Sequence, residues 1–255
     1  MSDRRFISNI GIHVYGFAAI ALGIIGLVWS DFTTVWQPVP PATPHYVVLA
    51  YAAAVCFLLA GAAVQWRRTA RAGLVVLILL YLTFAALWLK RVIGFPQMIG
   101  TWLGFAEEFA MAIGGVVAFA ASFSRDSRGA AITARVCYIV FGLCAIVFGL
   151  AHFLALKETT AFVPKWIPPG QQFWAIATGV AHALAGIAIL TGVLSVPASR
   201  LFTLMLLGFG AFVWIPMLMS NPHEHTMWAG NAINLVLAGA AWIVADSIAR
   251  REREA

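Results

Sequence analysis

The chain has 255 residues, of which 62% are hydrophobic and only 10% are charged, and its formal net charge is +6. Soluble domains carry about 25% charged and about 45–50% apolar residues, so a chain this apolar cannot cover its surface with polar groups. These values exclude an ordinary soluble domain and indicate that the main solvent of the protein is lipid. The positive charge does not indicate a nucleic-acid partner, because the basic residues stand at the ends of apolar segments.

Eight apolar segments follow one another, each close to the ~20 residues that a helix needs to cross a ~30 Å hydrocarbon core. They are continuous and rich in Ala and Leu instead of alternating, which excludes membrane strands as the main element. The third segment is short and is expected to tilt little. The sequence therefore predicts an all-α, polytopic membrane protein with eight transmembrane helices, at about residues 10–29, 46–66, 73–89, 102–123, 133–156, 173–195, 199–220 and 226–247.

Lys and Arg are distributed unequally between the two sides that these helices define. With the N-terminus inside, twelve basic residues lie in inner segments and four lie in outer ones, namely Lys90, Arg91, Lys157 and Lys165. Cytoplasmic segments carry an excess of Lys and Arg, so we expect both termini in the cytoplasm, in a bacterial-type inner membrane. The apolar run after Arg5 is too long for the core of a signal peptide, so we expect a retained first helix.

The chain repeats itself at a spacing of 126 residues. The recurring pairs are Gly16 and Gly142, Gly23 and Gly149, Pro38 and Pro164, Trp102 and Trp228, Gly104 and Gly230, and Gly114 and Ala240. This repeat predicts a duplicated four-helix module, with one copy at residues 1–127 and the other at 128–255. Each half holds an even number of spans, so we expect two tandem four-helix bundles related by a pseudo-twofold axis along the membrane normal.

Two proline-rich outer loops, Asp31–His45 and Lys157–Gln172, stand between the first and second span of each half. Proline removes a backbone donor and clashes with the preceding turn, so neither loop is expected to be a regular helix. Their tryptophans, among them Trp166, suit the lipid–water interface or a lid over the bundle. An interfacial plug shared by both halves is the simpler interpretation.

Ionisable side chains inside spans are costly and usually face the interior of a bundle, so each one is a candidate functional residue. Glu107 and Glu108 are adjacent in the fourth span and differ by about 100° in direction, so they cannot point the same way. The other candidates are His152 near the outer end of the fifth span, His182 near the middle of the sixth, and Asn231 and Asn234 on one face of the eighth. Hydrogen-bonded helix packing is the alternative role for all six.

We expect these six side chains to line one pocket between the halves, open toward the outer face, with Trp166 over its mouth. A carboxyl group or an imidazole can exchange protons there, and an asparagine can orient a carbonyl group. Such a pocket suits a quinone-like or small apolar ligand.

The sequence offers less for a metal ion or a haem. His223 and His225 form an HxH pair before the eighth span, a spacing that is common by chance in solvated loops. His152 and His182 are expected at depths about two turns apart, roughly 9 Å, whereas the two axial ligands of a haem need similar depths. None of the three cysteines belongs to a CxxC pair, and no phosphate-binding, dinucleotide-binding or hydrolase motif is present.

A series of short motifs runs through the second half, in the order His152-Phe153, Phe162 to Pro169 (FVPKWIPP), Phe173-Trp174, Thr178-Gly179 and Ala185-Gly186. Over residues 135–245 this series resembles the DoxX-like membrane proteins, and the first half matches them only through the internal repeat. The resemblance implies a four-helix membrane module, here doubled. It also implies an association with membrane redox systems, because the family includes a quinone-linked thiosulfate oxidoreductase subunit.

Three functions are compatible with these patterns. The first is a redox-associated inner-membrane protein, whose partners are the lipid bilayer and a redox protein. The second is a transporter for a small solute, although Pro216 is the only deep proline and no matching break occurs in the first half. The third is a non-catalytic assembly or anchoring subunit, in which the polar residues only hold helices together.

Overall fold

The computed structural model describes residues 10–123 and 128–254, and every regular element within these ranges is a helix. In chain order the elements are α2 (Ile10–Trp29), α3 (Tyr46–Val64), α4 (Ala70–Gly94), α5 (Ile99–Ala121), α6 (Arg128–Leu154), α7 (Leu156–Phe162), α8 (Gln171–Thr191), α9 (Ser195–Phe209), η1 (Gly210–Trp214), α10 (Ile215–Ser220) and α11 (His225–Glu254). Eight segments are long and apolar enough to cross a membrane, the seventh being α9, η1 and α10 together. The prediction of an all-α protein with eight spans is confirmed.

The third span is longer than predicted. Helix α4 has 25 residues and continues through Lys90 and Arg91 to Gly94. The guanidinium carbon of Arg91 lies 4.9 Å from the centroid of the Trp88 ring. Long basic side chains can keep their stems and planar groups against apolar surface at the end of a span, so these charges do not end the helix.

The two proline-rich loops differ in structure. The first, residues 31–45, contains no regular element, as predicted. The second begins with helix α7, so the expectation that it holds no helix is wrong for its first residues. The physical reason is that Leu156–Phe162 contains no proline, and the first proline of that loop is Pro164.

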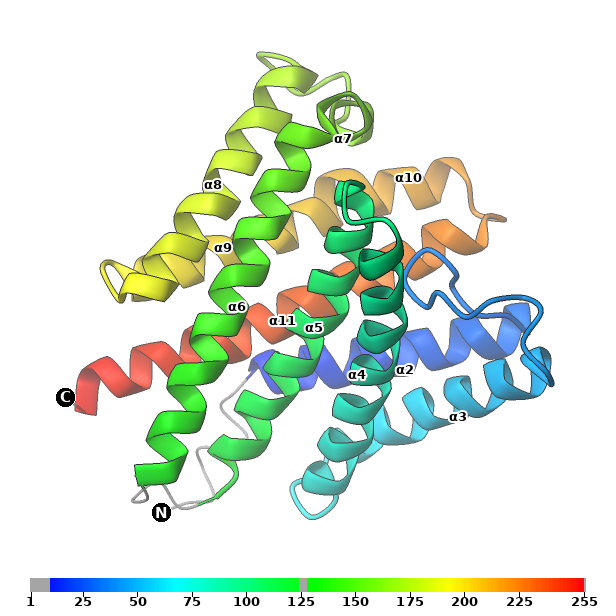
Figure 1. Ribbon diagram of the computed structural model, residues 1–255, viewed down its shortest axis with the longest axis horizontal. Coiled ribbons are helices and arrows are strands. Elements are labelled where there is room, and N and C mark those ends of the chain that lie inside the picture. Colours follow the sequence, from blue (N-terminus) through cyan, green and yellow to red (C-terminus); the bar gives the residue numbers. More distant parts are fainter. Residues whose placement is uncertain (1–9, 124–127, 255) are drawn as a thin grey trace.

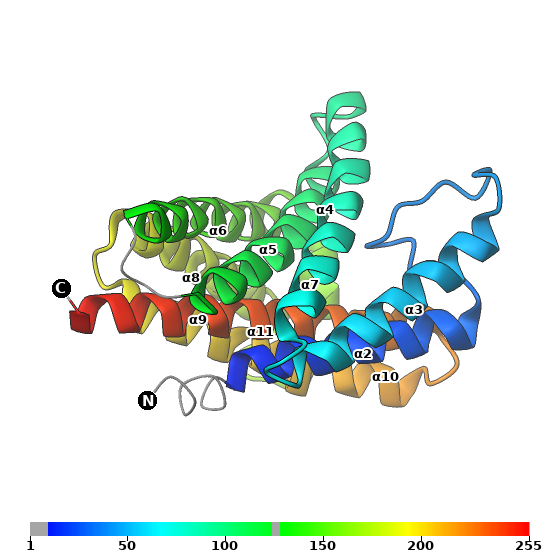
Figure 2. The same ribbon diagram turned by 90° about the horizontal axis from the view of Figure 1, so that it is seen from below.

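The spanning helices form a closed ring of neighbours. Each packs against the next spanning helix in the chain, and the last, α11, packs against the first, α2. Helices α5 and α11 also contact each other, so they form the centre of the ring. In Figure 1, α2 runs from left to right and α11 runs from right to left. The start of α2 and the end of α11 are therefore on the same side, and α11 runs beside α2 in Figure 2 as well.

Glycines bring neighbouring helices into backbone contact. A Cβ added to Gly16 on α2 would lie 3.0 Å from the carbonyl oxygen of Gly61 on α3. A Cβ added to Gly142 on α6 would lie 2.9 Å from the carbonyl oxygen of Gly186 on α8. In lipid, such close approach supplies the packing that holds helices together, because no hydrophobic force acts between them.

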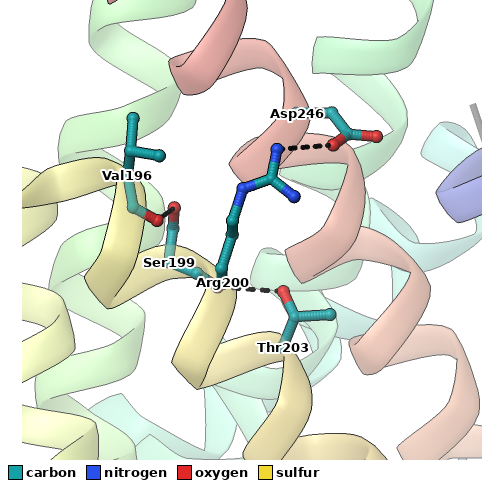
Figure 3. A network of polar contacts seen from close by, with 5 residues as sticks. All are labelled: Val196, Ser199, Arg200, Thr203 and Asp246. Atoms are coloured by element: carbon teal, nitrogen blue, oxygen red, sulfur yellow. Dashed lines mark hydrogen bonds and ion pairs between the residues drawn. The ribbon is translucent and has the colours of Figure 1, made fainter.

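A polar network joins α9 to α11 near the C-terminal end (Figure 3). Arg200 on α9 lies 3.6 Å from a carboxylate oxygen of Asp246 on α11. On α9 itself, the Ser199 hydroxyl donates to the carbonyl oxygen of Val196 at 3.1 Å, and the Thr203 hydroxyl donates to that of Ser199 at 2.9 Å. Polar side chains here therefore contact one another and the backbone at the end of α9 and α11.

Candidate functional site

A cavity of about 370 Å³ opens between the two halves of the chain. It is lined by the first turns of α5 and α11, the last turn of α6, parts of α7, α8, α9 and η1, and the loop after α2. Most lining side chains are aliphatic or aromatic, for example Leu103, Phe148 and Ile233. The size and the composition are those of a small-molecule site, in which a few polar groups fix the orientation of an apolar ligand.

Four of the seven side chains predicted to share a pocket line this cavity, namely Glu107, His152, His182 and Asn234. The first comes from the first half of the chain, and the other three come from the second half. Glu108, Asn231 and Trp166 are not among the lining residues. The structure therefore brings together the Glu107 carboxyl group, two imidazoles and one amide in a mostly apolar chamber, and the exposed Glu158 adds a second carboxyl group to its lining.

The rings of His152 and His182 are adjacent, with centroids 4.8 Å apart and planes inclined by 40°. The expectation that these residues differ in depth by about two turns is wrong. The reason is the tight packing of α6 on α8, where a Cβ added to Gly179 would lie 2.8 Å from the Cβ of His152. Gly179 therefore sets His152 at its own level, and His182 follows less than one helical turn further on.

Backbone carbonyl groups fix the tautomer of both rings. Nδ1 of His152 lies 2.9 Å from the carbonyl oxygen of Phe148, and Nδ1 of His182 lies 2.8 Å from that of Thr178. A carbonyl oxygen can only accept, so each Nδ1 carries the hydrogen and donates it. In the neutral rings Nε2 then holds the lone pair, and the cavity contains two adjacent hydrogen-bond acceptors.

The carboxyl group of Glu107 lies close to the side chain of Trp36, which comes from the loop after α2. The backbone of this tryptophan is also held, because Nε1 of Trp88 donates to its carbonyl oxygen at 2.9 Å. Trp36 was not predicted as a site residue. The repeat carried a signal for it, since Trp36 and Phe162 are 126 residues apart and both line the cavity.

Glu108 faces the interior of the first half. Its side chain is 0% exposed, and within the described part of the chain neither carboxyl oxygen has a hydrogen-bond partner. The hydroxyl group of Tyr81 likewise has none. Aromatic rings fill this region, with the centroids of Phe57 and Tyr81 5.4 Å apart. The buried carboxyl group of the first half thus lies among aromatic side chains and outside the cavity between the halves.

The two asparagines of α11 support the π-helical segment η1. Nδ2 of Asn231 donates to the carbonyl oxygens of Trp214 and Met227, each at 2.9 Å. Nδ2 of Asn234 donates to that of Leu206 at 3.0 Å. A π turn disturbs the regular hydrogen bonds of a helix, and in a membrane the freed groups need internal partners. Asn231 therefore braces the end of η1, and Asn234 contacts the backbone of α9 just before η1 while also lining the cavity.

The remaining predicted residues lie elsewhere. Trp166 is 67% exposed, and its ring centroid lies 6.4 Å from that of Phe212. The ring of His225 stacks on Trp29 at 5.0 Å, and His223 is exposed. The described residues contain no group of three or more His, Cys, Asp or Glu side chains that could hold a metal ion. The HxH pair is therefore not part of a larger ligand set in that part of the chain.

Fold and cavity together define a multi-pass, α-helical membrane protein with a mostly apolar internal site that holds two imidazoles and a carboxyl group. No protein-family model matches the chain, and comparisons with curated proteins and with solved structures find no match either. The function is consequently argued from the chemistry of the cavity.

Proposed function

We propose that the chain is a redox-associated inner-membrane protein that binds a quinone-like ligand in the cavity between its halves. The observation that carries this proposal is the adjacent pair His152 and His182, each held by a backbone carbonyl through Nδ1. The apolar walls accommodate a hydrocarbon ring and tail. The few polar side chains can each form a hydrogen bond with an oxygen atom at one end of the ring. A lipid-soluble ligand can reach such a site from the bilayer.

The polarity of the site favours the hydroquinone form of such a ligand. Quinone oxygens only accept hydrogen bonds, whereas hydroquinone hydroxyl groups also donate. Nε2 of His152 and Nε2 of His182 are acceptors, and the Glu107 carboxylate is another. Oxidation of a hydroquinone releases two protons and two electrons. We propose that an imidazole and Glu107 take the protons, while the electrons pass to a redox partner protein.

Titration of the purified chain with a short-tailed quinone analogue and with its hydroquinone tests this proposal. Trp36 and Trp214 line the cavity, so binding is expected to quench tryptophan fluorescence. We expect the hydroquinone to bind more tightly, and His182→Ala to weaken its binding about tenfold, the loss of one net hydrogen bond of about 1–1.5 kcal/mol. Absence of saturable quenching by both forms would overturn the proposal.

Two other functions predict different results in the same preparation. A small-solute transporter would catalyse uptake into proteoliposomes that His182→Ala abolishes. An assembly or anchoring subunit would bind no quinone, and would still recover its partner enzyme after Glu107→Gln and His182→Ala. The quinone proposal requires binding without uptake, and weaker binding in both variants.

We further propose that both termini lie in the cytoplasm and that the cavity opens on the opposite half of the membrane. Two observations support this orientation. Twelve basic residues lie in the segments on the side of the N-terminus and four lie on the other side, and the number of spans is even. Alkaline phosphatase fused after Ala255 is expected to be inactive, and a fluorescent protein at the same point is expected to fold and fluoresce. The reverse pattern would contradict this orientation.

We also propose a duplicated, DoxX-like four-helix module. Matching contacts in the two halves support the duplication. A Cβ on Gly104 would lie 2.6 Å from Cδ2 of Trp88, and a Cβ on Gly230 would lie 2.5 Å from Cε3 of Trp214. Both members of the first pair are 126 residues before their counterparts in the second. Expressing residues 128–255 alone, and finding whether they insert and bind the analogue, tests the independence of the second module.

A further inference from the structure

A second cavity, also of about 370 Å³, lies between α5, α6 and α11 at the end of the protein that holds the last turns of α5 and α11. Its wall is apolar where the last turn of α5 and the first turns of α6 meet, with Val117, Ala121 and Ala134 among the lining residues. On α11 it is lined by Ser247, Arg250 and Arg251. One side is therefore hydrocarbon-like and the other is cationic.

The length of α11 places the two arginines at the level of lipid head groups. At 1.5 Å per residue, the 30 residues of α11 extend about 45 Å. The hydrocarbon core is only ~30 Å thick, so the last turns of α11 leave it. The apolar wall lies at the ends of two spans, Ile99–Ala121 and Ala131–Leu154, and so borders the acyl region.

Arg250 and Arg251 are half-buried, whereas Arg253 on the same helix is exposed. Arg251 lies close to the Tyr138 side chain. The Tyr138 hydroxyl group in turn lies 2.6 Å from the hydroxyl of Ser247. These contacts hold the arginine side of the cavity to α6. Glu254 also lines the cavity and reduces its net positive charge to that of one arginine.

We infer that this cavity is a binding site for an anionic phospholipid. The phosphate group lies at Arg250 and Arg251, whose guanidinium groups bind phosphate through charge-assisted hydrogen bonds. An acyl chain lies against Val117, Ala121 and Ala134. Basic pockets between spans on the cytoplasmic side commonly take such head groups. The lipid would brace α5, α6 and α11, three of the helices at the boundary between the two halves.

Native mass spectrometry of the full chain in detergent tests this inference. We expect phosphatidylglycerol to be retained at least tenfold more strongly than phosphatidylcholine. Arg250→Gln and Arg251→Gln should each weaken retention about fivefold, since one basic residue near an anionic surface contributes about that factor. Arg253→Gln removes the same charge from the same helix outside the cavity, and should change retention less than twofold.

Equal retention of the two lipids, or an equal loss in Arg253→Gln, would overturn the inference. Inorganic phosphate at 10 mM is roughly tenfold above a dissociation constant of ~1 mM, as assumed for a simple phosphate site. If it displaces phosphatidylglycerol, the cavity is a site for free phosphate instead. Wild-type protein extracted from its own membranes gives a check that needs no variant. Its bound lipid should be richer in anionic species than the membrane it came from, and a matching composition would contradict the proposal.

Discussion

Gly114 and Ala240 touch at the crossing of α5 and α11, where a Cβ added to Gly114 would lie 2.7 Å from the Cα of Ala240. The two residues are also 126 positions apart, so each is the repeat counterpart of the other. A residue that contacts its own counterpart is what the proposed twofold axis between the halves would require at its centre. The close approach also indicates that this crossing tolerates no added volume.

Gly114→Ala is therefore expected to destabilise the protein. The new methyl group would meet Ala240, and both atoms belong to central helices that cannot shift independently of the ring. Overpacking of this kind costs about 1–3 kcal/mol. Thermal unfolding in detergent, followed by circular dichroism, should show a lower midpoint.

Gly208→Ala is the matched control for this change. Gly208 is the last residue but one of α9, where the helix continues into η1, and its added Cβ would meet only the Phe212 ring, at an ordinary contact distance of 4.0 Å. Alanine is the better helix former by about 0.5–1 kcal/mol, so this variant should be at least as stable as the wild type. An equal loss of stability in both variants would mean that the α5–α11 crossing has no special role.

The sequence predicted the helices well but could not predict which side chains meet. Continuous apolar runs of the right length determine spans through the thickness of the bilayer, so their existence follows from composition alone. The contact between His152 and His182 depends instead on Gly149 and Gly179, which let α6 and α8 approach and set their relative height. Depth counted from the ends of predicted spans cannot include that shift.

The positions of the adjacent residues Glu107 and Glu108 could likewise be predicted only in part from the sequence. Their 100° separation on α5 predicted two different environments, but not which residue would face the cavity. The structure directs Glu107 to the cavity and Glu108 to the ring cluster of the first half. The two positions therefore make opposite predictions under substitution.

Glu107→Gln is expected to weaken hydroquinone binding. The change keeps the size of the side chain but removes a carboxylate that can accept a proton, and hydrogen bonds to charged groups are worth about 1.5–3 kcal/mol. The dissociation constant from fluorescence quenching should rise roughly 10- to 100-fold. The unfolding midpoint should change little, because Glu107 is open to the cavity. A lower midpoint with unchanged binding would assign Glu107 to helix packing.

Glu108→Met is expected to raise stability while leaving the binding of hydroquinone unchanged. The wild-type carboxyl group is buried without a described partner, which costs about 1–3 kcal/mol of desolvation. Methionine has a similar volume and no polar group to satisfy. Thermal unfolding should therefore occur at a higher temperature than in the wild type. A large loss of binding would instead connect Glu108 with the chemistry of the cavity.

His182→Phe tests whether the cavity depends on a histidine at a place where the first half has a phenylalanine. Phe57 stands 125 residues before His182, and it packs within the aromatic cluster near Glu108. A phenylalanine at 182 would remove the Nε2 acceptor and occupy part of the cavity, so hydroquinone binding should fall at least tenfold. His223→Phe changes an exposed histidine outside the cavity and should not affect binding. Similar affinities in the two variants would exclude His182 from the site.

The number of residues between corresponding helix contacts differs between the two halves, and this difference explains the π-helical turn η1. Gly16 and Gly142 are 126 apart, but their partners Gly61 and Gly186 are only 125 apart. The spacing returns to 126 between Trp88 and Trp214, which cover equivalent glycines. One more residue therefore lies between Gly186 and Trp214 than between Gly61 and Trp88. We infer that the π-helical turn at 210–214 takes up that residue; Val213 and Trp214 within the turn and Phe209 beside it line the cavity.

Deletion of Ala211 should accordingly convert η1 into regular α-helix without unfolding the protein. Residues on both sides would keep their neighbours, because the first half already packs with the shorter spacing. The cavity wall would be rebuilt, so hydroquinone binding should weaken at least tenfold, as expected for loss of a site formed by a π-bulge. Deletion of Ala86 in α4 is the matched control, since no π turn is available there to restore the register, and it should abolish folding. If both deletions unfold the protein, or if deletion of Ala211 leaves binding intact, η1 neither absorbs an extra residue nor shapes the site.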